Sequence, residues 1–170
     1  MKEAQGNLFI MEAQAVCITT NGFVKSNGQP VMGRGCAKEY AQLFPETLID
    51  FGEKLKHVGN NIHHLTNDGD KDFYSFPVKP VNKMLINPND VVNHMRNKFK
   101  PGDTVPGWAC IADMYIITCS AYELVDIADL HDYENILIPR PGCGAGELNW
   151  SDVKPVLDRI LDDRFTAVTF

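Results

Sequence analysis

The sequence predicts an α/β fold, in which helices cover both faces of a sheet. Short apolar runs rich in β-branched residues alternate along the chain with stretches whose apolar residues recur at helical spacing. Two Gly-rich passages each join such a run to the start of a helix. With 170 residues, 44% of them hydrophobic, the chain is long enough for one domain with a full core. We therefore expect a single domain over residues 1–170.

The first expected strand and two expected helices lie before residue 60. Ala15–Thr20 is apolar and β-rich without alternation, as buried parallel strands can be. The passage Phe23–Gly35 is too long for a tight turn, and long ordered loops are commonly functional. Gly33-Arg34-Gly35 opens a helix that Pro45 closes, and Leu48–Val58 has the spacing of a second helix.

The next two strands, Ile62–Thr66 and Phe73–Val78, are predicted to form a hairpin. The aspartates between them imitate the start of a calcium-binding loop. That loop needs Gly at its sixth position and Glu at its twelfth, where this chain has Phe73 and Lys79, so a turn is favoured. The adjacent His63 and His64 would point to opposite faces of a strand, which disfavours joint metal ligation.

Four further elements and one more helix start are predicted in the second half. Asn87–Asp90 resembles a helix start, with apolar residues behind it as far as Phe99. The remaining elements are a helix between Trp108 and Asp129, a strand at Asn135–Ile138, a helix from about Ser151 and a strand at Phe165–Phe170. We place Pro155 in the first turn of the helix from Ser151, where proline is tolerated.

Composition limits the class of protein. The net charge of −6 and pI of about 5.3 argue against a large basic surface for nucleic acid, and no basic patch is evident. No apolar run approaches the roughly 18 residues of a membrane span, and the N-terminus lacks a signal-peptide pattern, so we expect a cytoplasmic protein without a membrane partner. The five cysteines are odd in number and form no C-x-x-C pair, so we expect neither disulfides nor a zinc site.

The two Gly-rich loops, Asn21–Gly35 and Pro139–Trp150, are the candidate site. Ligands of α/β sheets lie beyond the carboxyl ends of strands, where glycines admit the ligand and N–H groups face an anion. Each loop could therefore hold one phosphate of a diphosphate. Neither loop fits the dinucleotide pattern G-x-G-x-x-G closely, and the P-loop of NTPases is absent. A plain strand-to-helix connection is the alternative for each.

Four segments together resemble the macrodomains, a family that binds ADP-ribose. They are Gly6–Phe9, Ala15–Asn21, Met32–Ala37 and Pro139–Trp150, and their order and spacing fit over nearly the whole chain. The resemblance implies a three-layer α/β/α sandwich with a mixed, largely parallel central sheet. It also implies a ligand cleft over two adjacent central strands.

The resemblance also implies which residues bind the ligand. Gly6, Asn7 and Leu8 would meet the adenine, although many macrodomains have Asp where Asn7 stands. The distal ribose and one phosphate would be lined by Asn21, Gly33, Arg34, Gly35, Cys36 and Ala37. The diphosphate would be wrapped by Gly142, Cys143, Gly144, Ala145 and Gly146. Thr20, Met32 and Pro141 are further expected ligand-binding residues. Cys143 has no partner histidine nearby in the sequence, so we expect it to pack the loop rather than act as a nucleophile.

Within the family, the chain is most similar to the branch of terminal ADP-ribose glycohydrolases and of antitoxins that remove ADP-ribose from DNA. That branch has a catalytic lysine where Lys79 stands. A lysine there could attack the anomeric carbon of the distal ribose or place a cation beside it, the alternative being a solvated lysine. The glycohydrolases carry an aspartate at the position of Gly146, whereas here the carboxylate is next door, at Glu147. Glu147 would act as the acid/base or be only a charge at a helix start.

The expected function is binding of ADP-ribose and its hydrolysis from an ADP-ribosylated protein or nucleic acid. The alternatives are a reader that binds ADP-ribose without chemistry and a phosphatase acting on ADP-ribose 1″-phosphate, with a nicotinamide dehydrogenase a distant fourth. We expect a monomer that uses no cofactor and no metal.

Overall fold

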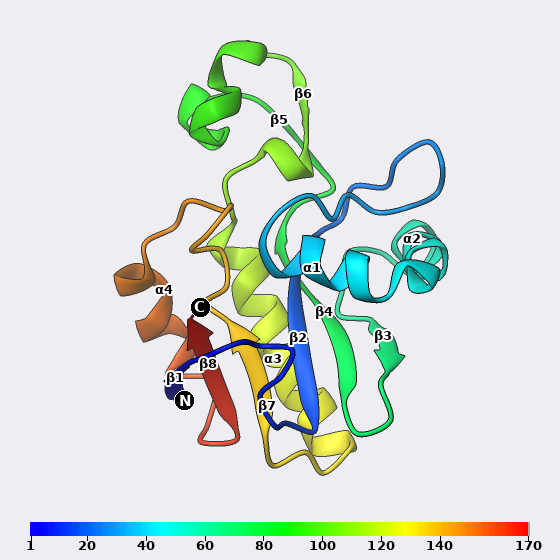
Figure 1. The fold of residues 1–170 in the computed structure, drawn as a ribbon. Helices are drawn as coiled ribbons and strands as arrows, with labels where there is room; N and C mark the ends of the chain where they lie inside the picture. The colour runs from blue at the N-terminus through cyan, green and yellow to red at the C-terminus, as the bar shows by residue number, and fades with distance from the viewer. Residues whose placement is uncertain (170) are drawn as a thin grey trace.

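The computed structural model describes residues 1–169, and its centre is a six-stranded sheet between two layers of helices (Figure 1). The strand order is β1-β8-β7-β2-β4-β3. All neighbouring strands are parallel except β3 and β4, which form the predicted hairpin. The strands are β1 (Lys2–Gln5), β2 (Ala15–Asn21), β3 (His64–Asn67), β4 (Asp72–Lys79), β7 (Ile136–Pro139) and β8 (Phe165–Thr169). The sheet is thus mixed and largely parallel, as predicted.

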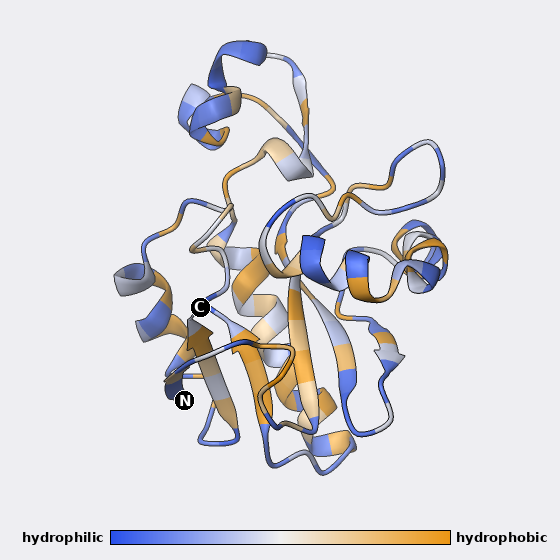
Figure 2. Ribbon diagram, viewed as in Figure 1, coloured by the Kyte–Doolittle hydropathy of each residue, from blue (hydrophilic) through white to orange (hydrophobic). Residues whose placement is uncertain are grey.

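Each face of the sheet has its own apolar core, because successive side chains of a strand point to opposite faces. In β2, Ala15 and Cys17 pack in one core with residues of α3 (Met114–Leu130) and α4 (Trp150–Leu157). Val16 and Ile18 pack in the other core with residues of α1 (Gly35–Leu43) and α2 (Leu48–His57). Figure 2 shows largely apolar strands at the centre, between helices that carry both polar and apolar residues. The predicted three-layer α/β/α sandwich is confirmed.

A small lobe, residues 80–111, projects beyond the carboxyl edge of the sheet and was not predicted (Figure 1). It contains an antiparallel hairpin of β5 (Asn82–Met84) and β6 (Thr104–Pro106). Its own apolar cluster consists of Leu85, Val91, Val92, Met95, Val105, Ala109 and Cys110. The two stems of the lobe touch at Gly107, where a Cβ would lie 1.7 Å from the carbonyl oxygen of Pro80. Only glycine allows that approach.

The helix predicted from Asn87 to Phe99 is wrong. Asn87 does cap a helical turn, since its side-chain oxygen accepts from the Asn89 N–H at 2.9 Å. The turn ends at once because the backbone of Val91 is extended and pairs with Cys110. The segment therefore consists of two 3-10 helices, Pro88–Asp90 and Asn93–Lys98, on either side of two buried valines.

The helix predicted from Trp108 begins later, at Met114. Asp113 is its N-cap, and the Asp113 carboxylate accepts from the N–H groups of Tyr115 and Ile116 at 2.8 and 3.4 Å. Trp108 belongs to the lobe instead, in the 3-10 helix Gly107–Ala109. The helical spacing of apolar residues continues from the lobe into α3, so it does not reveal where the helix starts. The N-cap residue Asp113 was the sequence signal that would have located that start.

Smaller differences concern the C-terminal part. Because α4 begins at Trp150, Pro155 lies in its second turn rather than its first. The last strand ends at Thr169 among the described residues, and Phe170 lies outside them. Cys17, Cys36 and Cys110 are buried. Within residues 1–169, no helix has the length and hydropathy required to cross a membrane.

Candidate functional site

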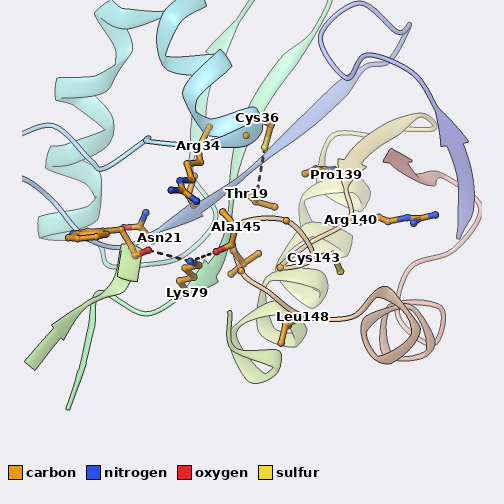
Figure 3. A pocket seen from close by; sticks show the side chains of 18 of the residues that line it. Thr19, Asn21, Arg34, Cys36, Lys79, Pro139, Arg140, Cys143, Ala145 and Leu148 are labelled. Carbon is orange, nitrogen blue, oxygen red and sulfur yellow. Dashed lines mark hydrogen bonds between the residues drawn. The ribbon is translucent and has the colours of Figure 1, made fainter. Parts of the chain in front are cut away.

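A cavity of about 800 Å³ opens at the carboxyl ends of the parallel strands (Figure 3). The last residues of β2, β4, β7 and β8, which are Asn21, Lys79, Pro139 and Thr169, all line it. The chain passes from β2 to β4 on one side and later returns to β7 on the other, so β2 lies at a topological switch point. The cavity is therefore where an α/β sheet commonly binds ligands.

The first wall of the cavity is the passage from Asn21 into α1. The Asn21 amide holds this passage, since it donates to the Val31 carbonyl at 2.9 Å and accepts from the Phe23 N–H at 3.0 Å. No side chain caps α1. Within residues 1–169, the N–H groups of Gly35, Cys36 and Ala37 have no protein acceptor, and all three residues line the cavity. This helix start offers free donors to an anion.

The second wall is the loop between β7 and α4, whose shape requires glycine at Gly142 and Gly146. Gly142 has a φ of +75° and accepts at its carbonyl from the Leu148 N–H at 3.0 Å. A Cβ on Gly146 would lie 2.5 Å from that same carbonyl oxygen and 2.6 Å from the Cβ of Ala112. In the described part of the chain, the N–H groups of Gly144, Ala145 and Gly146 donate to no protein group. The loop therefore presents a second set of free donors to the cavity.

Lys79, at the end of β4, joins the loop to the lobe. Its side chain is buried, and its ammonium donates to the carbonyl of Ala145 at 2.8 Å and to that of Trp108 at 3.3 Å (Figure 3). Burial lowers the pKa of Lys79 to about 8, and Arg34 adds to this effect while Cys110 and Glu147 oppose it. A substantial fraction of Lys79 is therefore neutral at mildly basic pH.

The cavity carries cationic side chains without carboxylates. Arg34, Lys79 and Arg140 line it, with His94 from the lobe, and no Asp or Glu does so among the described residues. Cys143 also lines it, but burial raises the pKa of its thiol to about 11, which agrees with a packing role. In a chain with a net charge of −6, these side chains are a local concentration of positive charge.

Arg140 and Trp150 line one end of the cavity. In Figure 3, Arg140 lies on the opposite side of the cavity from Lys79. The guanidinium lies 5.0 Å from the centre of the Trp150 ring, and both side chains donate to Glu3, at 2.9 and 2.8 Å. The Nε of Arg140 is buried and has no partner in residues 1–169. Trp150 thus anchors the loop and also lines the cavity.

Most of the sequence-predicted ligand residues come together here. Those that line the cavity are Thr20, Asn21, Gly33, Arg34, Gly35, Cys36, Ala37, Gly142, Cys143, Gly144, Ala145 and Gly146, together with the predicted catalytic Lys79. Those that do not line it are Gly6, Asn7, Leu8, Met32, Pro141 and Glu147. Leu8 is fully buried in the core, and the side-chain oxygen of Asn7 accepts from the Phe9 N–H at 2.8 Å. Thr20 Oγ1 is buried without a partner in the described residues.

Sequence reasoning missed the contribution of the lobe and of Arg140. His94 and Trp108 belong to the lobe and line the cavity, and no pattern in the sequence indicated the hairpin of the lobe. Arg140 directly follows the last residue of β7, a position at the carboxyl edge that could have been singled out.

The sequence and the fold were compared with those of known proteins. No protein-family profile and no curated protein matches the sequence. The fold does match solved structures. The macrodomain of Mycobacterium tuberculosis DarG has a TM-score of 0.68 at 16% identity, with 98% of this chain and 95% of that chain covered. The macrodomain of Thermus aquaticus DarG has a TM-score of 0.69 at 17% identity, covering 99% and 97% of the two chains.

A third match is Thermosipho africanus DarTG in complex with ADP-ribose, with a TM-score of 0.67 at 18% identity. It covers 96% of this chain and 39% of that longer chain. The sheet order, the two helical layers and these similarities together show that the chain has the macrodomain fold.

Proposed function

We propose that this chain binds ADP-ribose and hydrolyses it from an ADP-ribosylated protein or nucleic acid. The observation that carries the proposal is the cavity with two walls of free N–H groups, lined by Arg34, Lys79 and Arg140 and by no described carboxylate. Two anionic phosphates would satisfy those donors, and buried donors without acceptors are costly. The volume of about 800 Å³ lies within the range typical of small-molecule sites.

The structural neighbours support the same ligand. The Thermosipho africanus DarTG structure contains ADP-ribose, and its fold matches nearly the whole of this chain. In the orientation implied by the resemblance, the diphosphate lies between the start of α1 and the loop Gly142–Gly146. The distal ribose then lies toward Asn21 and Lys79.

Lys79 is proposed to carry the chemistry. Its lowered pKa leaves part of the amine neutral near pH 8, and a neutral amine is a nucleophile. The amine forms a bond to C1″ of the distal ribose as the bond from C1″ to the macromolecule breaks, and the departing group takes up a proton. Water then releases Lys79 and leaves a hydroxyl on C1″.

Calorimetry with ADP-ribose tests the binding, and intrinsic fluorescence provides a second measurement because both tryptophans of the chain line the cavity. Saturable binding at one site per chain is expected. Release of ADP-ribose from a panel of modified proteins and oligonucleotides then tests the hydrolysis. The absence of ADP-ribose binding by either method would refute the proposal.

A second candidate, a reader that binds ADP-ribose without cleaving it, is favoured by one observation. The position at which related glycohydrolases carry an aspartate is Gly146, where a side chain would collide with the Gly142 carbonyl. Tight binding without release from any modified protein, modified DNA or phosphorylated ADP-ribose would select this candidate.

A further inference from the structure

Three contacts join the lobe, or the residues that flank it, to the loop between β7 and α4. The Lys79 ammonium joins the carbonyls of Trp108 and Ala145, and the Ala112 N–H donates to the Gly146 carbonyl at 2.9 Å. In the third contact, the Glu147 carboxylate accepts from the Asn93 N–H, at 2.9 Å to one oxygen and 3.1 Å to the other. The first two contacts involve residues at or next to the ends of the lobe, Lys79, Trp108 and Ala112. Asn93, in contrast, lies near the middle of residues 80–111.

The backbone at Glu147 shows that this contact is built into the loop. Glu147 has a φ of +60°, in the left-handed region that L side chains other than Asn and Asp rarely adopt. The Glu147 carboxylate reaches the lobe at Asn93, and Glu147 itself does not line the cavity. A disfavoured conformation of this kind persists where surrounding contacts hold it and is frequent at ligand clamps.

We propose that Glu147 is a positioning residue, which clamps the lobe against the loop and thereby holds His94 at the rim of the cavity. His94 directly follows Asn93, whose N–H donates to Glu147. His94 belongs to the lobe and lines the cavity. The bond is charge-assisted and therefore stronger than a neutral one. The expected effect of this contact on ADP-ribose binding rests on the proposed function. The contact between Glu147 and the lobe does not depend on that function.

The first experiment tests the clamp without ligand. Hydrogen exchange followed by mass spectrometry compares the wild-type chain with Glu147→Asn, because asparagine tolerates a positive φ but is one methylene shorter. Peptides that cover residues 91–99 should exchange at least about tenfold faster in the variant, because exchange requires opening of the hydrogen bond. Peptides from β2 and β4 should be unchanged. Unchanged exchange over 91–99 would overturn the proposal.

Two matched variants separate the clamp from general destabilisation. Glu147→Gln keeps an acceptor oxygen at the same reach and should restore much of the protection over 91–99. Glu46→Gln removes an exposed carboxylate far from the lobe and should leave exchange there unchanged. Equal deprotection by Glu147→Gln and Glu147→Asn would contradict the claim that an acceptor oxygen at this reach is what holds the lobe.

The second experiment measures the consequence for the ligand. Stopped-flow tryptophan fluorescence should show ADP-ribose leaving Glu147→Asn about tenfold faster than wild type, with a smaller change in the association rate. His94→Ala should raise the dissociation rate in the same direction, and adding it to Glu147→Asn should have little further effect. Additive effects would show that Glu147 does not act through His94. If wild type binds no ADP-ribose, the proposed function fails, and the exchange experiment still decides on the clamp.

Discussion

The two ends of β4 differ in how their charged residues are satisfied. At its start, the Asp72 carboxylate accepts hydrogen bonds from His64, Asn67 and Tyr133. At its end, the Lys79 ammonium donates to two carbonyls but lines a cavity at which the N–H groups of two loops lack partners in residues 1–169. Polar groups that stabilise the fold are paired within the protein, whereas groups left unpaired at a cavity indicate a ligand that completes them.

Replacement of Lys79 should produce the largest change. Lys79→Ala should reduce release of ADP-ribose from modified substrates by at least about 100-fold while changing ADP-ribose affinity only a few-fold. The reason is that the amine acts on C1″ and the N–H groups of the two loops hold the phosphates. Turnover assays and calorimetry measure the two effects, with Lys2→Ala, an exposed position on β1, as the control. Unchanged turnover would remove Lys79 from the chemistry.

Filling the space at Gly146 should damage the cavity next most severely. Gly146→Ala places a Cβ 2.5 Å from the Gly142 carbonyl oxygen, so the loop must shift. We expect ADP-ribose affinity to fall at least about tenfold and stability to fall by about 1–3 kcal/mol, as in overpacked sites. Gly144→Ala is the matched control for stability, since no heavy atom lies within 4 Å of its added Cβ. An equal loss of stability in both variants would show that the clash is not the cause.

The pH dependence of turnover distinguishes the two roles available to Lys79. Its pKa of about 8 means that the neutral amine increases as pH rises through 8 and the ammonium increases as pH falls. A nucleophilic Lys79 therefore predicts a rate that rises with pH and levels off above about 8. A rate that instead falls above about 8 would indicate the cation as the active form.

The smallest effect is expected at the other end of β4. Asp72→Asn should lower the free energy of unfolding by about 1–2 kcal/mol near pH 7 and leave ADP-ribose affinity unchanged. Burial opposes ionisation of Asp72, but hydrogen bonds from Tyr133, Asn67 and His64 outweigh it and lower the pKa. A carboxyl whose pKa is lowered by folding stabilises the protein above its unfolded pKa, about 3.9, and loses this contribution as pH falls through the folded value.

Denaturant titrations of wild type and Asp72→Asn at pH 7 and at about pH 3 measure this contribution. The difference between the two proteins should shrink at the lower pH. A loss of ADP-ribose affinity in Asp72→Asn would contradict the separation between the two ends of the strand.

The sequence predicted the parts of this structure that depend on local signals. The apolar run Ala15–Thr20 and the helix spacing of Leu48–Val58 correspond to β2 and α2 because both bury their side chains in the sheet's cores. The Gly-rich loops were located because glycine is required where backbone segments approach closely, as Gly146 shows.

The lobe could not be predicted in the same way. Val91 and Val92 fit a helical pattern, but they are extended because Val91 pairs with Cys110, a residue distant in sequence. The positions of His94 and Trp108 at the cavity, and the contact between Glu147 and Asn93, follow from that pairing. Contacts of this kind depend on tertiary packing and have no periodic signature.

Calorimetric titration of the chain with ADP-ribose decides whether the cavity binds this ligand. We predict one saturable site per chain, whose affinity falls at least about tenfold in Gly146→Ala and is retained in Asp72→Asn. No heat of binding for the wild-type chain, together with no change in tryptophan fluorescence, would contradict it.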